Sequence, residues 1–156
     1  MIFHQGPAAF RAVLTGLAAS CALAAAALAQ SPGFDPPTLP PNTIAVGLIQ
    51  QDFSDCTNTT VKDDPNRTRG GEIFVTKNKD GTATVEVGIL ATPNTTYQFY
   101  LKCVRVLGDI KTDDEGSGEG MFSFKVSEVG ATFAFDMYPG GAPSGDKFQS
   151  LTATMP

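Results

Sequence analysis

The sequence predicts an all-β domain of about seven short antiparallel strands, which form a two-sheet sandwich or an open barrel and are held by one disulfide. Three observations support this fold class. Apolar and polar residues alternate in several short segments. The turns between these segments draw on 16 glycines and 11 prolines. Beyond residue 42, no segment combines helical spacing of apolar residues with helix-capping residues.

Residues 1–29 are predicted to be a cleaved secretory signal peptide. Arg11 precedes an apolar run made mostly of alanine, which ends in the small-x-small sequence Ala27-Leu28-Ala29. Two alternatives are an uncleaved membrane anchor and a lipid anchor on Cys21. The run has no basic residue on its far side, and the leucine before Cys21 lies one place too far away for a lipidation motif. We therefore expect a secreted or periplasmic chain without membrane insertion after cleavage.

The mature chain is expected to begin with an extended spacer at residues 30–42, which contains five prolines, followed by one β-domain at residues 43–156. Cleavage removes one of the 11 basic residues, Arg11, and leaves ten against 16 acidic residues, a net charge of −6. A chain without a basic stripe is a poor partner for nucleic acid or anionic membranes.

Six strands are predicted from alternation or from β-branched and aromatic residues between turn signals. The clearest is Thr82–Leu90, in which Ala83, Val85, Val87 and Ile89 face one way. Asn78-Lys79-Asp80-Gly81, which precedes it, predicts a hairpin. The other five contain Ile44, Val46 and Leu48; Ile73 and Val75; Phe122, Phe124 and Val126; Phe133, Phe135 and Met137; and Leu151, Ala153 and Met155.

A seventh and longest strand is predicted at Thr96–Leu107. Tyr97, Phe99, Leu101 and Cys103 share one face, but after Cys103 the apolar residues change to the other phase. A strand cannot change faces without a bulge or an edge, so we expect an irregularity near Cys103.

Cys56 and Cys103 are the cysteines of the mature chain. In an oxidising compartment two cysteines are expected to form one disulfide, and an inward Cys103 would place it against the core. Two reduced thiols are the alternative.

The segment Ala91-Thr92-Pro93-Asn94-Thr95-Thr96-Tyr97 resembles the tyrosine corner of fibronectin type III domains. The resemblance implies an immunoglobulin-like antiparallel β-sandwich in which the Tyr97 hydroxyl bonds to the backbone of the preceding turn. It covers seven residues, and the chain lacks the core tryptophan of that family. Only the structural role of Tyr97 is carried over, because a shared fold does not imply a shared function.

Several kinds of catalysis are excluded by composition. The single histidine, His4, lies in the predicted signal peptide, so the mature chain has no imidazole for a Ser-His-Asp or Cys-His arrangement or for a histidine-based metal site. Paired carboxylates remain available, and these run glycoside hydrolysis. Tyr97, Tyr100 and Tyr138 are the tyrosines that could stack against a sugar.

An acidic segment at residues 109–120 is a candidate calcium site. Its glycine-rich chain carries five carboxylates, and flexible oxygen ligands suit calcium. The spacing does not match an EF-hand, and a solvated hairpin loop that keeps strand edges apart is the favoured alternative. The candidate ligands are Asp109, Asp113, Asp114, Glu115 and Glu119.

The sequence favours a non-catalytic binding or surface-associated module whose partner is an extracytoplasmic protein or glycan, with no cofactor other than a possible calcium ion. The alternatives are a small carboxylate-based hydrolase resembling glycosidases and a purely structural extracellular protein. A cleft that gathers two acids with a tyrosine would favour the hydrolase. A flat surface with apolar patches would favour binding.

Overall fold

The computed structural model describes residues 38–141 and 146–156. The predicted signal peptide, Cys21 and most of the spacer lie outside these residues. The described part contains ten strands and one 3-10 turn: β1 Thr43–Gln50, β2 Arg69–Lys77, β3 Thr82–Leu90, β4 Thr96–Leu101, β5 Arg105–Lys111, β6 Ser117–Lys125, η1 Val126–Glu128, β7 Thr132–Phe133, β8 Phe135–Pro139, β9 Phe148–Ser150 and β10 Ala153–Thr154. None of its helices is long and apolar enough to cross a membrane. The domain is all-β, as predicted.

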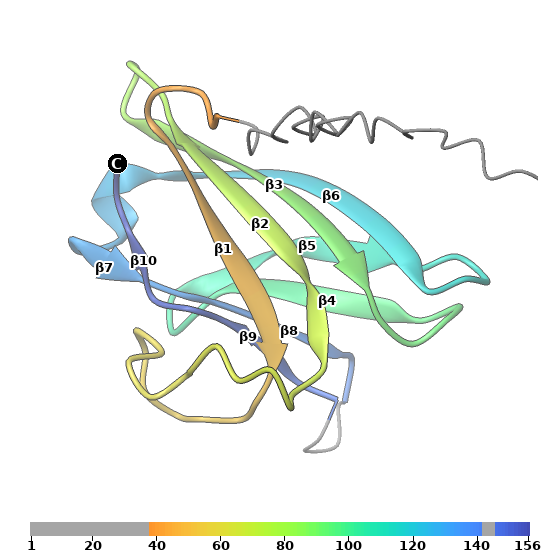
Figure 1. The fold of residues 1–156 in the computed structure, drawn as a ribbon. Coiled ribbons are helices and arrows are strands. Elements are labelled where there is room, and N and C mark those ends of the chain that lie inside the picture. The colour runs from red at the N-terminus through yellow and green to blue at the C-terminus, as the bar shows by residue number, and fades with distance from the viewer. Residues whose placement is uncertain (1–37, 142–145) are drawn as a thin grey trace, which may run out of the picture. The chain divides into compact units, whose positions relative to one another are not determined.

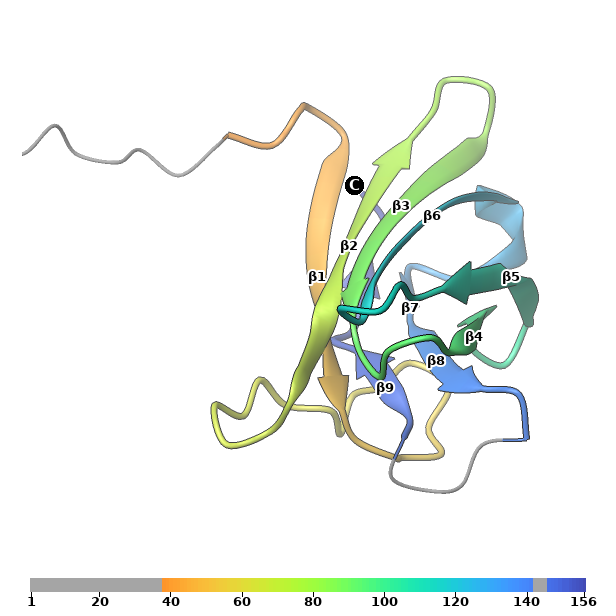
Figure 2. The same cartoon turned by 90° about the vertical axis from the view of Figure 1, so that its right-hand side faces the viewer.

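Eight strands form a single antiparallel sheet in the order β5-β4-β8-β9-β1-β2-β3-β6 (Figure 1). The two outermost strands, β5 and β6, follow each other in sequence and lie in contact. The sheet therefore curls round until its ends meet, which gives a barrel-like domain (Figure 2). β7 and β10 form a separate two-stranded ribbon.

The core lies inside the curled sheet and consists of the inward-facing residues of each strand. β3 follows the predicted alternation, because Ala83, Val85, Val87 and Ile89 are all buried. Aromatic rings fill the centre: Phe99 stacks on Phe122 and Phe135, each with ring centroids 5.3 Å apart. Burial of these side chains is the main stabilising term of such a fold.

The predicted long strand at 96–107 is broken into two strands, β4 and β5, which pair with each other as a hairpin. The turn lies at Cys103, which has a φ of 58°. The Val104 N–H donates to the Leu101 carbonyl at 2.9 Å across this turn. The irregularity expected near Cys103 is thus a reversal of chain direction, and the resulting hairpin also contains a register shift between Phe99 and Tyr100. The reversal is one reason why the estimate of about seven strands is too low.

The predicted disulfide between Cys56 and Cys103 is present, with Cα atoms 5.5 Å apart. Both cysteines are exposed, so the expectation that Cys103 faces the core is wrong. Because Cys103 lies in the hairpin turn, its side chain leaves the inward row formed by Tyr97, Phe99 and Leu101. The disulfide ties this turn to the long loop at residues 51–68, which runs beside β8 and β9 (Figure 1).

Tyr97 is fully buried, and its hydroxyl oxygen accepts a hydrogen bond from the Thr92 N–H at 3.1 Å. This contact joins the start of β4 to the turn that contains Pro93. It is the arrangement that the tyrosine-corner resemblance implies.

Candidate functional site

Strand register places a row of apolar and acidic side chains on the outer face of β2, β3 and β6. Phe74 pairs with Glu86, which pairs with Met121. In the next row Glu72 pairs with Gly88, which pairs with Glu119. The intervening residues of β2 and β3, such as Ile73 and Val85, face the core, so these two rows face outward.

The two rows enclose a shallow groove of about 480 Å³. Gly88 forms part of its floor, and a Cβ atom added there would meet no other atom within 4 Å. Glycine weakens a strand interior and often marks a close approach by another group. The lining residues are Phe74, Glu86, Val87, Gly88, Glu119, Gly120 and Met121.

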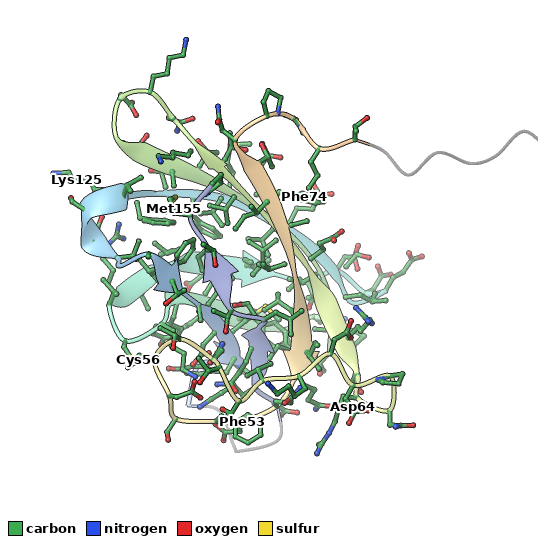
Figure 3. The ribbon with its side chains drawn as sticks, turned by 60° about the vertical axis from the view of Figure 1, so that its left-hand side comes forward. Phe53, Cys56, Asp64, Phe74, Lys125 and Met155 are labelled. Carbon is green, nitrogen blue, oxygen red and sulfur yellow. A yellow bond between two sulfur atoms is a disulfide. The ribbon has the colours of Figure 1, made fainter. Side chains whose placement is uncertain are left out.

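Met121 is the most exposed large apolar side chain of the described residues, at 72%. It lies across the groove from Phe74, since Glu86 separates the two in the register. Figure 3 shows Phe74 on β2, well away from Phe53 and Cys56 of the long loop. Leu90, at the end of β3, is 59% exposed and lines a neighbouring hollow with Glu72. Leu90 and Met121 lie on the same outer face of the sheet, and several exposed apolar side chains on one face mark an interaction surface more strongly than one alone.

The groove is acidic. Glu86 and Glu119 line it, and neither carboxylate forms an ion pair or hydrogen bond with another residue of the described chain. Glu72 adds a third carboxylate in the same row as Glu119. Among the described residues, no lysine or arginine lines the groove. Its potential therefore favours a cationic group on whatever binds there.

The tyrosines that were candidates for sugar stacking are not in the groove. Tyr97 is buried in the core. Tyr100 and Tyr138 stack on each other with centroids 4.7 Å apart, and the Lys147 Nζ lies 5.2 Å from the centre of the Tyr138 ring. Hydrogen bonding with the Tyr138 hydroxyl, together with burial, raises the pKa of Tyr100 to about 12. The pair therefore offers little free ring face for a sugar.

A hydrolase was expected to gather two acids and a tyrosine in one cleft. The described residues of the groove include two acids but no tyrosine. Glycosidases place their acids on either side of a bound sugar, which aromatic rings commonly hold. Here the groove pairs its acids with Phe74 and Met121 on an open face. This arrangement is closer to the apolar surface expected of a binding module.

The acidic segment is divided among three elements. Asp109 belongs to β5 and Glu119 to the groove on β6. Asp113 closes the turn between them, where its Oδ1 accepts the N–H groups of Glu115 at 3.0 Å and Ser117 at 2.8 Å. Asp114 and Glu115 are exposed in that turn. Within residues 38–141 and 146–156, no three acidic, cysteine or histidine side chains gather closely enough to hold a metal ion. Calcium binding stays a prediction, and the described residues contain no cluster of ligands that supports it.

Sequence reasoning did not single out Phe74, Gly88 or Met121. Two signals were present. Gly88 interrupts an otherwise regular strand, and Met121 is an apolar residue out of phase with Phe122 and Phe124. The pairing of β3 with β6, which brings these residues together, joins strands separated in the chain by β4 and β5.

Comparison with known proteins finds no family model that matches the chain and no curated protein that is similar to it.

Proposed function

We propose that the mature chain is a non-catalytic binding domain that acts outside the cytoplasm. Its partner is a protein segment that presents an apolar side chain flanked by lysine or arginine, and it binds in the groove between β2, β3 and β6. One observation carries this proposal: Met121 is 72% exposed in a groove that also holds Glu86 and Glu119 without a cationic partner.

The groove supplies both affinity and specificity for such a segment. Covering Phe74 and Met121 removes apolar surface from water, which contributes about 25 cal/mol for each Å² buried. The carboxylates at Glu86 and Glu119 attract basic side chains and disfavour acidic ones, which affects the association rate and the choice of partner more than affinity. The open space above Gly88 admits a side chain of the partner.

The test uses a displayed library of random peptides selected on the full mature chain. Selected peptides are expected to combine an aromatic or aliphatic residue with nearby lysine or arginine, and their binding is expected to weaken as salt is raised. Met121→Lys and Gly88→Val are each expected to weaken binding at least tenfold. Met121→Lys adds a positive charge that repels a basic ligand. Gly88→Val fills the space above the groove floor.

Gly140→Val is the matched control. Gly140 is also a glycine whose added Cβ meets nothing within 4 Å, and it lies in the loop after β8 rather than in the groove. Its binding is expected to equal that of the unaltered chain. Peptides that are acidic, or that bind Met121→Lys and Gly88→Val as tightly as the unaltered chain, would contradict the proposal. Selection of no peptide at all would favour the purely structural alternative.

We propose a resemblance to immunoglobulin-like domains only for the tyrosine corner at Tyr97. The hydrogen bond between Thr92 and the Tyr97 hydroxyl supports it. The continuous order of strands from β5 to β6 instead favours the open barrel, the other arrangement that the sequence predicted.

A further inference from the structure

A second cluster of polar side chains lies on the opposite half of the sheet, beneath the loop at residues 51–68. Its members are Lys102, Asn58, Asp136 and Gln149, which are 8%, 0%, 7% and 0% exposed. Lysine and aspartate are rarely buried to this extent. Their position away from the groove separates them from the proposed binding function.

The amine of Lys102 is held against the side-chain amide of Asn58. The Lys102 Nζ donates to the Asn58 Oδ1 at 2.5 Å and to the Phe53 carbonyl at 2.8 Å. Because a C=O bond is about 1.23 Å long, Nζ lies no more than about 3.7 Å from the Asn58 Cγ. This is close to the separation of about 3–3.5 Å that precedes attack on a carbonyl.

The amide itself is fixed in orientation. The Asn58 Nδ2 donates to the carbonyls of Ser150 at 2.9 Å and Phe135 at 3.3 Å. The Asn58 backbone has a φ of 54° and is held in a turn by the hydrogen bond from the Val61 N–H to its carbonyl at 3.0 Å. The amide carbonyl therefore points at the amine of Lys102, and its NH2 group points away.

A carboxylate stands beside the amine. The Asp136 Oδ1 lies 3.5 Å from the Lys102 Nζ and accepts a hydrogen bond from the Gln149 Nε2 at 3.2 Å. Burial raises the pKa of Asp136 against the opposing effects of Lys102, Lys147 and Gln149. Transfer of a proton from the ammonium to Asp136 would remove both charges from a buried site, where charged groups are costly.

We propose that Lys102 and Asn58 form an intramolecular isopeptide bond, with Asp136 as the general base. The Lys102 ammonium gives one proton to Asp136, and the neutral Nζ attacks the Asn58 Cγ. The Cγ–Nδ2 bond then breaks as Asp136 returns the proton to Nδ2. One hydrogen of the attacking amine also passes to the departing nitrogen, so that an ammonium ion leaves, Asp136 is again ionised and a secondary amide remains. No oxidant, reductant or further reactant is needed.

The site supplies the two conditions that this condensation requires. The reacting atoms are held together, which replaces a bimolecular encounter with an intramolecular one of high effective concentration. The loop covers the site, where Lys102 and Asp136 are only 8% and 7% exposed, so bulk water does not surround the reacting groups. The bond would join the same two segments as the disulfide, since Asn58 lies two residues after Cys56 and Lys102 directly precedes Cys103.

The test is peptide mapping of the full exported chain by mass spectrometry, after denaturation, reduction, alkylation and trypsin. Reduction ensures that the disulfide cannot account for any linkage. The expected product is a branched species in which the peptide ending at Lys62 is joined to residues 80–105, with Lys102 uncut. Its mass is expected to be lower than the sum of the two peptides by one ammonia.

Three variants define the chemistry. Asn58→Ala and Lys102→Met are expected to abolish the branched peptide. Asn58→Asp is expected to retain it with loss of one water instead of one ammonia, because a protonated carboxyl group can condense with the same amine. Lys111→Met is the control, because Lys111 is exposed at the end of β5, outside the buried cluster, and it is expected to retain the branch.

Asp136→Asn is expected to reduce the branched fraction more than tenfold while circular dichroism shows the β-sheet retained. If Asp136→Asn does not fold, the presence or absence of the branched peptide in the digest of the unaltered chain still tests the proposal. Loss of ammonia by cyclisation of Gln30 at the new N-terminus would not join two peptides, so the branch distinguishes it. Separate peptides with Lys102 cut by trypsin, in the folded unaltered chain, would overturn the proposal.

Discussion

The two halves of the curled sheet differ in whether a loop covers their outer face. On β2, β3 and β6 the outer face is uncovered, and Phe74 and Met121 lie in an open groove with unpaired glutamates. On β4, β8 and β9 the loop at residues 51–68 covers the outer face, and Lys102, Asp136 and Gln149 become buried. The same alternation of side chains thus produces an exposed apolar surface on one half and a buried polar one on the other.

The difference shows that the loop at residues 51–68, rather than the strands, determines whether side chains on the outer face are buried or exposed. Every buried side-chain nitrogen or oxygen of the described residues has a hydrogen-bond partner, because an unpaired one would cost about 1–3 kcal/mol. Where no loop lies, the unpaired glutamates are solvated and carry no such cost. The covered half is therefore expected to respond to substitution through stability, and the open half through binding.

The largest expected effect is on the covered half. In an Asn58→Ala background, where the proposed bond cannot form, Lys102→Met leaves Asp136 buried without a cation and the Phe53 carbonyl without its donor, and is expected to lower the free energy of unfolding by about 3–5 kcal/mol. Chemical denaturation measures this change. The double variant Lys102→Met/Asp136→Leu is expected to lose clearly less, because no charge is then left unpaired.

The exposed ion pair between Lys147 and Asp52 provides the control, and Lys147→Met is expected to cost no more than about 1 kcal/mol. Equal losses for Lys102→Met and Lys147→Met would show that the loop does not bury the Lys102 site.

The second effect tests how the loop is held in place. Cys56→Ser/Cys103→Ser opens a loop whose ends are 47 residues apart and is expected to lower the free energy of unfolding by about 4 kcal/mol in an Asn58→Ala background. Where Asn58 and Lys102 are joined, the same pair of substitutions is expected to cost much less, because the proposed bond already closes that loop. Equal costs in both backgrounds would count against a second cross-link.

The open half was easier to predict from sequence than the covered half. β3 has the bounds expected of it, Thr82–Leu90, because strict alternation of apolar residues needs only local information. The hairpin at Asn78–Gly81 also forms, with Gly81 at a φ of 82°. Its outer groove was missed because it depends on the register between β3 and β6, which the local sequence does not contain.

The covered half was harder because its defining features are not local. The turn at Cys103 places a residue other than glycine in the left-handed region, without the Asn-Gly or Gly-Gly signal that usually marks a hairpin. Lys102 and Asp136 each resemble ordinary solvated residues in strand-like segments. Only the fold brings them together beneath the loop at residues 51–68.

A smaller effect is expected where the two halves join. Tyr97→Phe removes the acceptor for the Thr92 N–H and is expected to lower the free energy of unfolding by about 1 kcal/mol. Thermal or chemical unfolding measures it, and Tyr100→Phe is the comparison, since the Tyr100 hydroxyl bonds to a partly exposed side chain, Gln98. If Tyr97→Phe and Tyr100→Phe have equal effects, the corner at Tyr97 has no special role in stability.

The smallest effect on stability is expected in the groove, where the effect on binding is expected to be largest. Met121→Lys changes a side chain that is 72% exposed, and such surface substitutions usually alter stability by no more than about 0.5 kcal/mol. Phe124→Ala, on the inner face of the same strand, is expected to cost about 3–5 kcal/mol, because Phe124 is buried against Phe133 and Phe135. Chemical denaturation of both variants, beside the peptide-binding assay, separates the two roles of β6. A large loss of stability in Met121→Lys would mean that Met121 stabilises the fold. Its exposure would then no longer support a binding site on the open face.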